Sequence, residues 1–126
     1  MALRDKKNPT IIHSFRYALE GIWYAFKNER NFRIHTAAVI VVLVMAKIFA
    51  LSVMKISILI IVIGIVLALE LMNTAIECVV DLASPDYHPL AKIAKDTASG
   101  AVFIFSIVAV IIGVLFFIPP ILRLVL

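Results

Sequence analysis

Three long apolar stretches run through the sequence, and they constrain the fold more than any other feature. They cover roughly residues 34–51, 56–80 and 98–118. Each is close to the ~20 residues that an α-helix needs to cross ~30 Å of hydrocarbon. With 126 residues that are 63% hydrophobic, the chain has more apolar surface than a soluble domain of this length could bury. The sequence therefore predicts an all-α integral membrane protein that forms one domain, residues 1–126.

The expected membrane helices, with their polar ends, cover about residues 34–51, 56–83 and 89–118. Pro89 is a favourable first residue for the third helix. Pro119 and Pro120 are expected to end it, because proline lacks the backbone N–H that continues a helix. Residues 1–33 are charged throughout and contain no apolar core, so we expect no cleavable signal peptide.

An N-terminal amphipathic helix is expected over about residues 9–30. Apolar side chains recur there at intervals of three and four, with charged residues between them: Ile12, Phe15, Leu19, Ile22, Trp23 and Phe26. Trp23 and the tyrosines beside it suit the headgroup region, so we place this helix flat on the membrane surface. It would act either as an anchor alone or as an anchor that also forms one wall of a site.

The distribution of basic residues predicts the orientation in the membrane. Of the 12 lysines and arginines, nine lie before the first span or in the second connection: Arg4, Lys6, Lys7, Arg16, Lys27, Arg30, Arg33, Lys92 and Lys95. Only Lys47, Lys55 and Arg123 lie on the opposite side. By the positive-inside rule, the N-terminus faces the cytoplasm and the C-terminus faces outward. Because the basic residues flank spans and form no aromatic-interleaved patch, we expect no nucleic-acid partner.

The second apolar stretch carries polar residues at helical spacing. At 100° per residue, Glu70, Thr74, Glu77 and Asp81 lie within about 60° of one another, with Asn73 at the edge. Glu70 lies about 10.5 Å deeper than Glu77. Carboxylates in lipid are costly, so these residues are functional candidates. The alternative is hydrogen bonding between helices of an oligomer. The lone cysteine, Cys78, is interpreted as packing.

A second polar group follows the turn after this helix. Lys92, Lys95 and Ser99 share one helix face with His88, and Asp96 lies beside them. Together with Glu29, in the turn before the first span, they would form the walls of one cytoplasmic cleft. No glycine-rich phosphate-binding loop is present, so phosphates would be held by side chains and metal. Phosphoryl transfer needs a divalent metal, a cation and a positioned acceptor hydroxyl. Two carboxylates, Glu29 and Glu77, suit Mg²⁺.

Three segments resemble the bacterial integral-membrane diacylglycerol kinase family, and in particular its undecaprenol kinase branch from Gram-positive bacteria. They are Asn28-Glu29-Arg30-Asn31, Glu70-Leu71-Met72-Asn73-Thr74-Ala75-Ile76-Glu77, and His88-Pro89-Leu90-Ala91-Lys92-Ile93-Ala94-Lys95-Asp96 with Ser99-Gly100-Ala101. The resemblance covers almost the whole chain. It implies a homotrimer of three-span subunits, each with a surface helix, whose active sites are shared between neighbours. It also implies transfer of the ATP γ-phosphate to a lipid alcohol at the plasma membrane of a bacterium.

The resemblance also implies roles for individual residues. Glu29 and Glu77 would bind the metal ions that accompany ATP, and Glu70 would accept the proton of the lipid hydroxyl, with Asp96 as the other candidate base. The nucleotide would lie among eight residues: Tyr17, Glu29, Glu77, Asp86, Tyr87, His88, Lys95 and Asp96. The acceptor would lie near Glu70, Asn73 and Ser99. The depths of the glutamates agree with these roles. The shallow Glu29 and Glu77 would meet aqueous metal–ATP, and the deeper Glu70 would meet an alcohol arriving from the bilayer.

The chain departs from proteobacterial members at two positions. They have an arginine where this chain has Thr10, and a glutamine where it has Ile34. Lys6, Lys7 or Arg16 could replace the missing arginine. The Arg33-Ile34-His35 segment resembles the undecaprenol kinase branch, and it favours that substrate. We interpret His35 as an interfacial anchor rather than as a headgroup contact.

The leading hypothesis is an ATP- and Mg²⁺-dependent kinase that converts undecaprenol to undecaprenyl phosphate at the cytoplasmic face of the membrane. The near alternative is a diacylglycerol kinase that makes phosphatidic acid. A small proton-coupled transporter is a distant alternative, because it needs carboxylates near the bilayer midplane rather than at the cytoplasmic edge. A catalytically inert assembly subunit is a further alternative, in which Glu77 would be dispensable.

Overall fold

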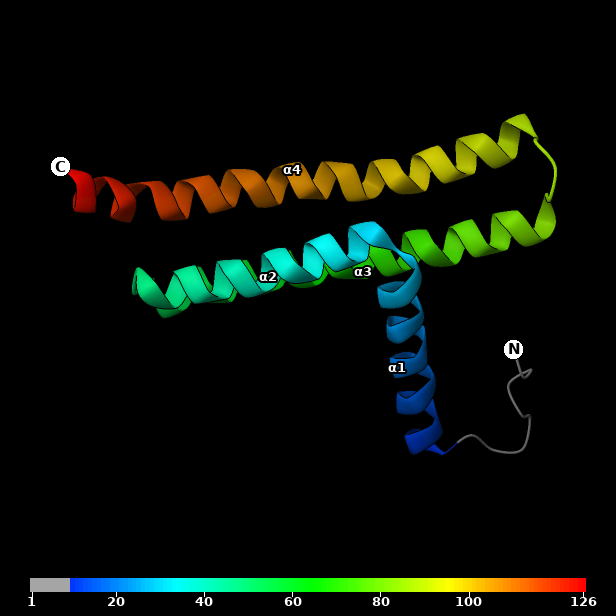
Figure 1. The fold of residues 1–126 in the computed structure, drawn as a ribbon, viewed down its shortest axis with the longest axis horizontal. Helices are drawn as coiled ribbons and strands as arrows, with labels where there is room; N and C mark the ends of the chain where they lie inside the picture. Colours follow the sequence, from blue (N-terminus) through cyan, green and yellow to red (C-terminus); the bar gives the residue numbers. More distant parts are fainter. Residues whose placement is uncertain (1–9) are drawn as a thin grey trace.

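The computed structural model describes residues 10–126, and this part of the chain consists of four α-helices and short connections (Figure 1). The helices are α1 (Ile11–Asn28), α2 (Arg30–Ile48), α3 (Val53–Ala83) and α4 (Pro89–Val125). The last three are long and apolar enough to cross a membrane. The predicted all-α architecture is therefore confirmed, with three helices that have the length and composition of membrane spans.

Helices α2, α3 and α4 lie side by side, and α1 runs crosswise from the bundle (Figure 1). Helix α2 has 19 residues, whereas α3 has 31 and α4 has 37. At 1.5 Å per residue, α3 and α4 are about 46 and 56 Å long, against about 28 Å for α2. The turn that joins α3 to α4 therefore extends well beyond the level at which α1 joins the bundle.

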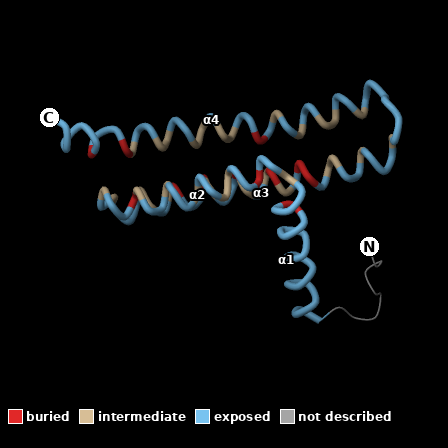
Figure 2. Tube along the Cα trace, viewed as in Figure 1, coloured by how far each residue is buried: buried red, intermediate tan, exposed pale blue. Residues whose placement is uncertain are grey.

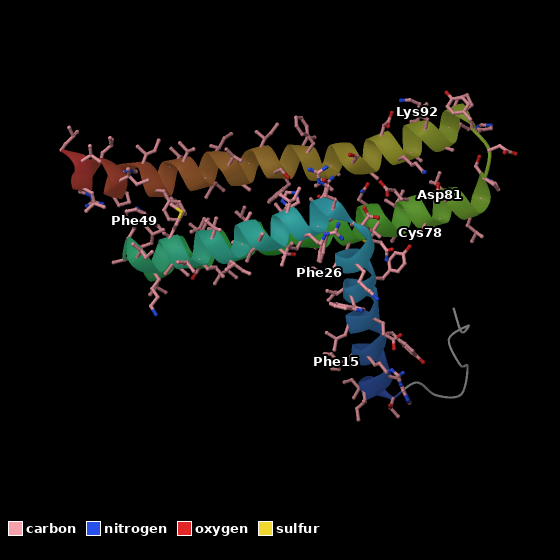
Figure 3. All side chains as sticks on the ribbon, in the orientation of Figure 1. Phe15, Phe26, Phe49, Cys78, Asp81 and Lys92 are labelled. Carbon is pink, nitrogen blue, oxygen red and sulfur yellow. The ribbon has the colours of Figure 1, made fainter. Side chains whose placement is uncertain are left out.

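The buried core of a single chain is small (Figure 2). Its main cluster contains Ala46 of α2, Leu59 of α3 and Phe117 of α4, near the turn between α2 and α3. Phe49, labelled in Figure 3, meets Phe117 edge to face, with ring centroids 6.2 Å apart. Most other apolar side chains of the three long helices point outward, as expected for surfaces that face lipid or neighbouring protein.

The turn between α2 and α3 is a Schellman motif with an unusual residue at its centre. The N–H of Leu51 donates to the carbonyl of Ala46 at 3.0 Å, and that of Ala50 donates to Lys47 at 3.1 Å. Ala50 has a φ of 49°, in the left-handed region that glycine normally occupies. Ser52 then caps α3, because its hydroxyl accepts from the N–H of Lys55 at 3.3 Å.

The helix boundaries differ from those expected in the sequence because polar residues join the helices. The expected surface helix ends at Asn28, α2 begins at Arg30 rather than near residue 34, and it ends at Ile48. Helix α3 begins at Val53 rather than near residue 56. An apolar pattern marks the part of a helix that fits lipid, whereas backbone hydrogen bonding continues into the polar ends.

The expectation that Pro119 and Pro120 end the third membrane helix was wrong. Helix α4 continues through both prolines to Val125. Proline has a φ value compatible with a helix, so it removes individual hydrogen bonds without forcing the chain to turn. Near the end of a long helix this loss is tolerated, and Arg123 Nε donates to the carbonyl of Pro119 at 3.4 Å.

Candidate active site on helices α2 and α3

The corner between α1 and α2 presents Glu29. This residue has extended backbone angles, with φ −106° and ψ 112°, so it separates two helices that would otherwise be continuous. Arg33 fixes the corner, because its Nη1 donates to the carbonyls of Phe26 at 3.0 Å and Lys27 at 2.9 Å. A cation at the carboxyl end of α1 also suits the helix dipole. Glu29 is half-buried at this fixed corner.

The polar face of α3 is largely buried. Glu70, Asn73 and Thr74 are the only buried polar or charged residues in the described part of the chain. Thr74 Oγ1 donates to the carbonyl of Glu70 at 3.1 Å, so its hydroxyl is satisfied within the helix. Asn73 Nδ2 donates to Glu77 Oε1 at 3.2 Å, whereas Asn73 Oδ1 is buried and has no hydrogen-bond partner. This oxygen can accept a hydrogen bond, and it lies on α3 between Glu70 and Glu77.

Glu70 meets a residue that the sequence analysis assigned to membrane anchoring. His35 Nε2 of α2 lies 3.1 Å from Glu70 Oε1, and the Glu70 side chain is only 4% exposed. The interpretation of His35 as an interfacial anchor was therefore incomplete. Glu29 and Glu77 lie close enough to Glu70 for their charges to act on it. Glu70 and Glu77 thus lie on one face of α3, near the corner that presents Glu29.

The basic and acidic residues at the start of α4 are paired. Lys95 forms an ion pair with Asp81 of α3, and Lys92 forms one with Asp96 one turn along its own helix. Asp81 and Lys92 both lie near the turn between α3 and α4 in Figure 3. Lys95 is therefore tied to the polar face of α3, as a cation that serves the same site would be. Ser99 and Asp96 are exposed.

Other residues expected near the nucleotide lie further apart. His88 caps α4, because its Nδ1 accepts from the N–H of Leu90 at 3.1 Å. Asp86 and Tyr87 are exposed in the same turn, and Ser84 Oγ donates to the carbonyl of Asp86 at 2.8 Å. Tyr17 stacks on His13 along α1. Within residues 10–126, no hydrogen bond or ion pair joins these nucleotide candidates to the glutamates.

Arg16 is the one described residue among those expected to replace the arginine that proteobacterial members have at the position of Thr10. Lys6 and Lys7 lie outside the described residues. Arg16 is exposed and forms an ion pair with Glu20 at 2.9 Å. Thr10 itself caps α1 with its backbone, and its hydroxyl lies 2.9 Å from His13 Nδ1.

Cys78 provides a contact between α1 and α3 (Figure 3). Its thiol lies 3.9 Å from the Tyr24 hydroxyl, within reach of a weak hydrogen bond to sulfur. This hydrogen bond, with burial and the charges of Glu29 and Asp81, raises the pKa of the Tyr24 hydroxyl. Cys78 therefore packs against the surface of α1, and Tyr24 stays neutral at physiological pH.

The chemistry of the donor set fits a magnesium ion only in part. Carboxylate oxygens are its preferred protein ligands, and Mg²⁺ usually keeps waters and phosphate oxygens as its remaining ligands. Glu29 and Glu77 supply two carboxylates of this kind. No group of three or more His, Cys, Asp or Glu side chains in residues 10–126 could hold a metal on its own. The residues present therefore suit an ion that arrives with a phosphate ligand.

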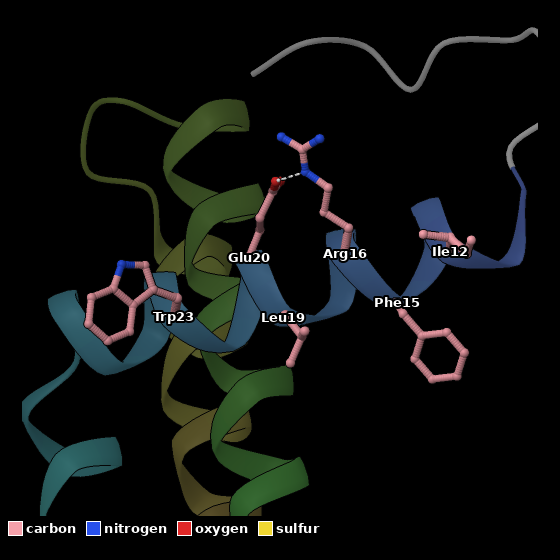
Figure 4. A pocket seen from close by; sticks show the side chains of 6 residues that line it. All are labelled: Ile12, Phe15, Arg16, Leu19, Glu20 and Trp23. Atoms are coloured by element: carbon pink, nitrogen blue, oxygen red, sulfur yellow. Dashed lines mark hydrogen bonds and ion pairs between the residues drawn. The ribbon is translucent and has the colours of Figure 1, made fainter.

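Two hollows lie elsewhere on the described chain. One, of about 500 Å³, is formed by side chains of α1 alone, and Figure 4 shows Arg16 and Glu20 at one edge of it and Phe15 and Leu19 at the other. The lining residues are Ile12, Phe15, Arg16, Leu19, Glu20 and Trp23. The other, of about 430 Å³, is an apolar groove between α2, α3 and α4 with His35 in its wall. Neither hollow includes Glu29 or Glu77.

Comparison with known proteins identifies the family of this chain. The family described as prokaryotic diacylglycerol kinase matches residues 16–117. Diacylglycerol kinase of Synechocystis sp. is 47% identical over 117 residues, which are 92% of this chain and 67% of that protein. Undecaprenol kinase of Bacillus subtilis is 46% identical over 121 residues, 94% of this chain and 98% of that protein. Diacylglycerol kinase of Escherichia coli (strain K12) is 39% identical over 101 residues, 80% of this chain and 83% of that protein.

The match spans α2 and α3, most of α1 and most of α4, and so it includes the glutamates and His35. The chain therefore belongs to the prokaryotic diacylglycerol kinase family and is a membrane-embedded lipid kinase.

Proposed function

We propose that this protein transfers the γ-phosphate of ATP to undecaprenol, with Mg²⁺, and so makes undecaprenyl phosphate. The observation that carries the proposal is the buried Glu70, grouped with Glu29 and Glu77 where α1 crosses the bundle. A buried carboxylate in a membrane helix is costly, and its role as the base that takes the proton of a lipid alcohol would explain why it is present.

The choice of undecaprenol is supported by similarity along the full length of one relative. The B. subtilis undecaprenol kinase is matched over 98% of its length. Diacylglycerol remains the second candidate acceptor, because the Synechocystis relative of nearly equal identity is a diacylglycerol kinase. Both acceptors present a hydroxyl at the membrane interface on an apolar tail. The family match gives no support to the transporter or inert-subunit alternatives.

In the proposed reaction, Glu70 takes the proton of the acceptor hydroxyl. The hydroxyl oxygen forms a bond to the γ-phosphorus while the bond from that phosphorus to the bridging oxygen of ADP breaks. Asn73 Oδ1, which is buried without a partner, is placed to accept a hydrogen bond near the same carboxylate. Its amide also holds Glu77 at 3.2 Å, and so it links the acceptor side to the nucleotide side.

On the nucleotide side, Glu29 and Glu77 would hold Mg²⁺. The bound ion would neutralise phosphate charge during transfer. Lys95 is the proposed phosphate cation, and Asp81 keeps it beside the polar face of α3 until a phosphate replaces that partner. Tyr17, Asp86, Tyr87, His88 and Asp96 are proposed as nucleotide contacts, and Ser99 as an acceptor contact.

The proposed setting is the plasma membrane of a bacterium. Helix α1 would lie flat on the cytoplasmic surface with its apolar residues in the headgroup region. The ends of α3 and α4 would then project into the cytoplasm, where ATP is available, and the C-terminus would face outward. The excess of basic residues on the N-terminal side supports this orientation.

We propose that the working unit is a homotrimer with sites shared between neighbours. A single chain leaves Glu29 and Glu77 outside both described hollows. It also leaves Tyr17, on α1, and the turn between α3 and α4 apart (Figure 1). A neighbouring subunit would supply the missing wall.

The acceptor assignment is tested with the full-length chain in lipid vesicles and γ-labelled ATP. Undecaprenol and diacylglycerol are compared at equal mole fractions, each titrated to saturation. We expect label in both lipids, with a kcat/KM for undecaprenol at least about tenfold higher. A higher kcat/KM for diacylglycerol would replace undecaprenol as the assigned acceptor, and no label in any lipid alcohol would contradict the kinase proposal.

A further inference from the structure

The contact between His35 and Glu70 joins two membrane helices at the most buried carboxylate of the chain. His35 Nε2 lies 3.1 Å from Glu70 Oε1, and the side chains are 28% and 4% exposed. No other side chain in the described residues forms an ion pair or a hydrogen bond with the Glu70 carboxylate. The imidazole is therefore the single side-chain group that fixes the direction of this carboxylate.

The groove beside His35 contains one other side chain that can donate a hydrogen bond, Ser106. The imidazole forms part of the wall of the apolar groove between α2, α3 and α4. The other lining residues are apolar or glycine apart from Ser106, which lies on α4, so none of the neighbours on α2 can donate a hydrogen bond. In a medium of low dielectric constant, one fixed donor has a large effect on the orientation of a carboxylate.

We propose that His35 is a positioning residue that holds Glu70 Oε1, so that Oε2 points to the acceptor hydroxyl. This inference rests on the proposed kinase function and goes beyond it, because it assigns a role to a residue of α2. The proton still passes from the acceptor hydroxyl to Glu70, and the O–P bond forms as the γ-phosphate leaves ADP. His35 keeps its own proton throughout and does not contact the nucleotide.

The test uses three variants of the full-length chain in vesicles with undecaprenol and Mg²⁺–ATP. His35→Phe keeps a ring but removes the nitrogen, whereas His35→Gln places an amide N–H close to the position of Nε2. Thr36→Val is the matched control, because the Thr36 hydroxyl only donates to the carbonyl of Phe32, at 2.8 Å, on the same helix. We measure kcat and the KM for each substrate.

A misplaced catalytic group typically costs about two orders of magnitude in rate. We therefore expect His35→Phe to lower kcat by about 10- to 100-fold with less than about a twofold change in the KM for ATP. His35→Gln should regain most of that loss, and Thr36→Val should match the wild type. A merely structural histidine would not produce this split or this rescue.

The NMR signal of His35 provides a second test, which still decides the question if a variant at position 35 folds poorly. In chains labelled with ¹⁵N-histidine, the His35 Nε2 signal should move on Glu70→Gln and remain in place on Glu20→Gln. An unmoved signal would overturn the inference, as would wild-type kcat in His35→Phe or equal losses in the Phe and Gln variants. Failure of the wild type to label any lipid alcohol would instead overturn the proposed function, and this inference with it.

Discussion

Glu70, the proposed catalytic base, is expected to reduce the stability of the fold. It is 3% exposed within a helix long and apolar enough to cross a membrane, and a carboxylate costs up to roughly 2.5–3.5 kcal/mol on insertion scales, the value for the centre of such a helix. The contact with His35 recovers only part of this cost. Asn73, one turn along, adds a buried oxygen without a partner. These two residues are what a sequence optimised for stability alone would replace.

Glu70→Leu should therefore stabilise the folded chain while removing its activity. We expect the free energy of unfolding to rise by about 1 kcal/mol, since an apolar side chain avoids the desolvation of the carboxylate. Unfolding by SDS in mixed micelles measures the change, and Glu20→Leu on exposed α1 is the control. A clear loss of stability in Glu70→Leu would mean that the carboxylate holds the fold together.

Ala50 offers an independent change away from the site. Its φ of 49° is unfavourable for a residue with a Cβ, and glycine removes that clash. We expect Ala50→Gly to raise the free energy of unfolding by about 0.5–1 kcal/mol, with turnover unchanged. The same SDS titration tests this, and a destabilised variant would show that the turn tolerates the left-handed alanine without strain.

At the scale of the element, the helices could be predicted from the sequence where periodicity carries the information. Three apolar stretches of sufficient length predicted the three long helices, and the 100° spacing placed Glu70, Thr74 and Glu77 on one face. The contact of His35 with Glu70 was missed, because it depends on how α2 is rotated against α3 and no spacing within one helix encodes that. The extension of α4 past Pro119 was missed because proline was expected to end the helix. That expectation ignored the long helix before Pro119, which tolerates the loss of a few hydrogen bonds.

The start of α4 gives a prediction about the nucleotide side. Lys95 is held beside α3 by Asp81, so we expect it to reach a phosphate when one binds. Lys95→Met should raise the KM for ATP by about tenfold or more, because a charge-assisted contact is lost. Lys47→Met, near the end of α2 on the opposite side of the bundle, is the control. Steady-state kinetics with ATP as the varied substrate measure both.

The opposite result for Lys95 is equally informative. An unchanged KM for ATP, together with lower stability of Lys95→Met, would mean that the pair with Asp81 only joins α3 to α4. In that case another cation would have to face the phosphates.

For the whole molecule, one chain is too thin to enclose a site. Only nine apolar residues are buried among those described: Ala25, Phe32, Ala46, Leu59, Val62, Val66, Val102, Phe117 and Pro120. Lipid can cover the remaining apolar side chains, but it cannot satisfy the polar face of α3. A neighbouring subunit could supply a partner for the buried Asn73 Oδ1, which agrees with the proposed sharing of sites.

The purified protein should therefore be a trimer in mild detergent. Sedimentation with correction for bound detergent should give a mass of three 14.0 kDa chains, and amine cross-linking should stop at the trimer. The mass should be unaffected by Glu77→Gln, which changes the site but not the fold. A monomer that retains full turnover would show that one chain builds the site alone.

The central claim is that glutamates at the membrane surface hold magnesium and nucleotide for transfer to a lipid alcohol. Its most direct test is turnover against Mg²⁺ concentration for the wild type, Glu77→Gln and Glu20→Gln in undecaprenol vesicles. Glu20 is the matched control, because it is an exposed glutamate paired with Arg16 on α1. We predict that Glu77→Gln lowers turnover by about 100-fold and requires more Mg²⁺ for half its maximal rate, whereas Glu20→Gln matches the wild type. Equal turnover and equal Mg²⁺ dependence in all three chains would contradict the account.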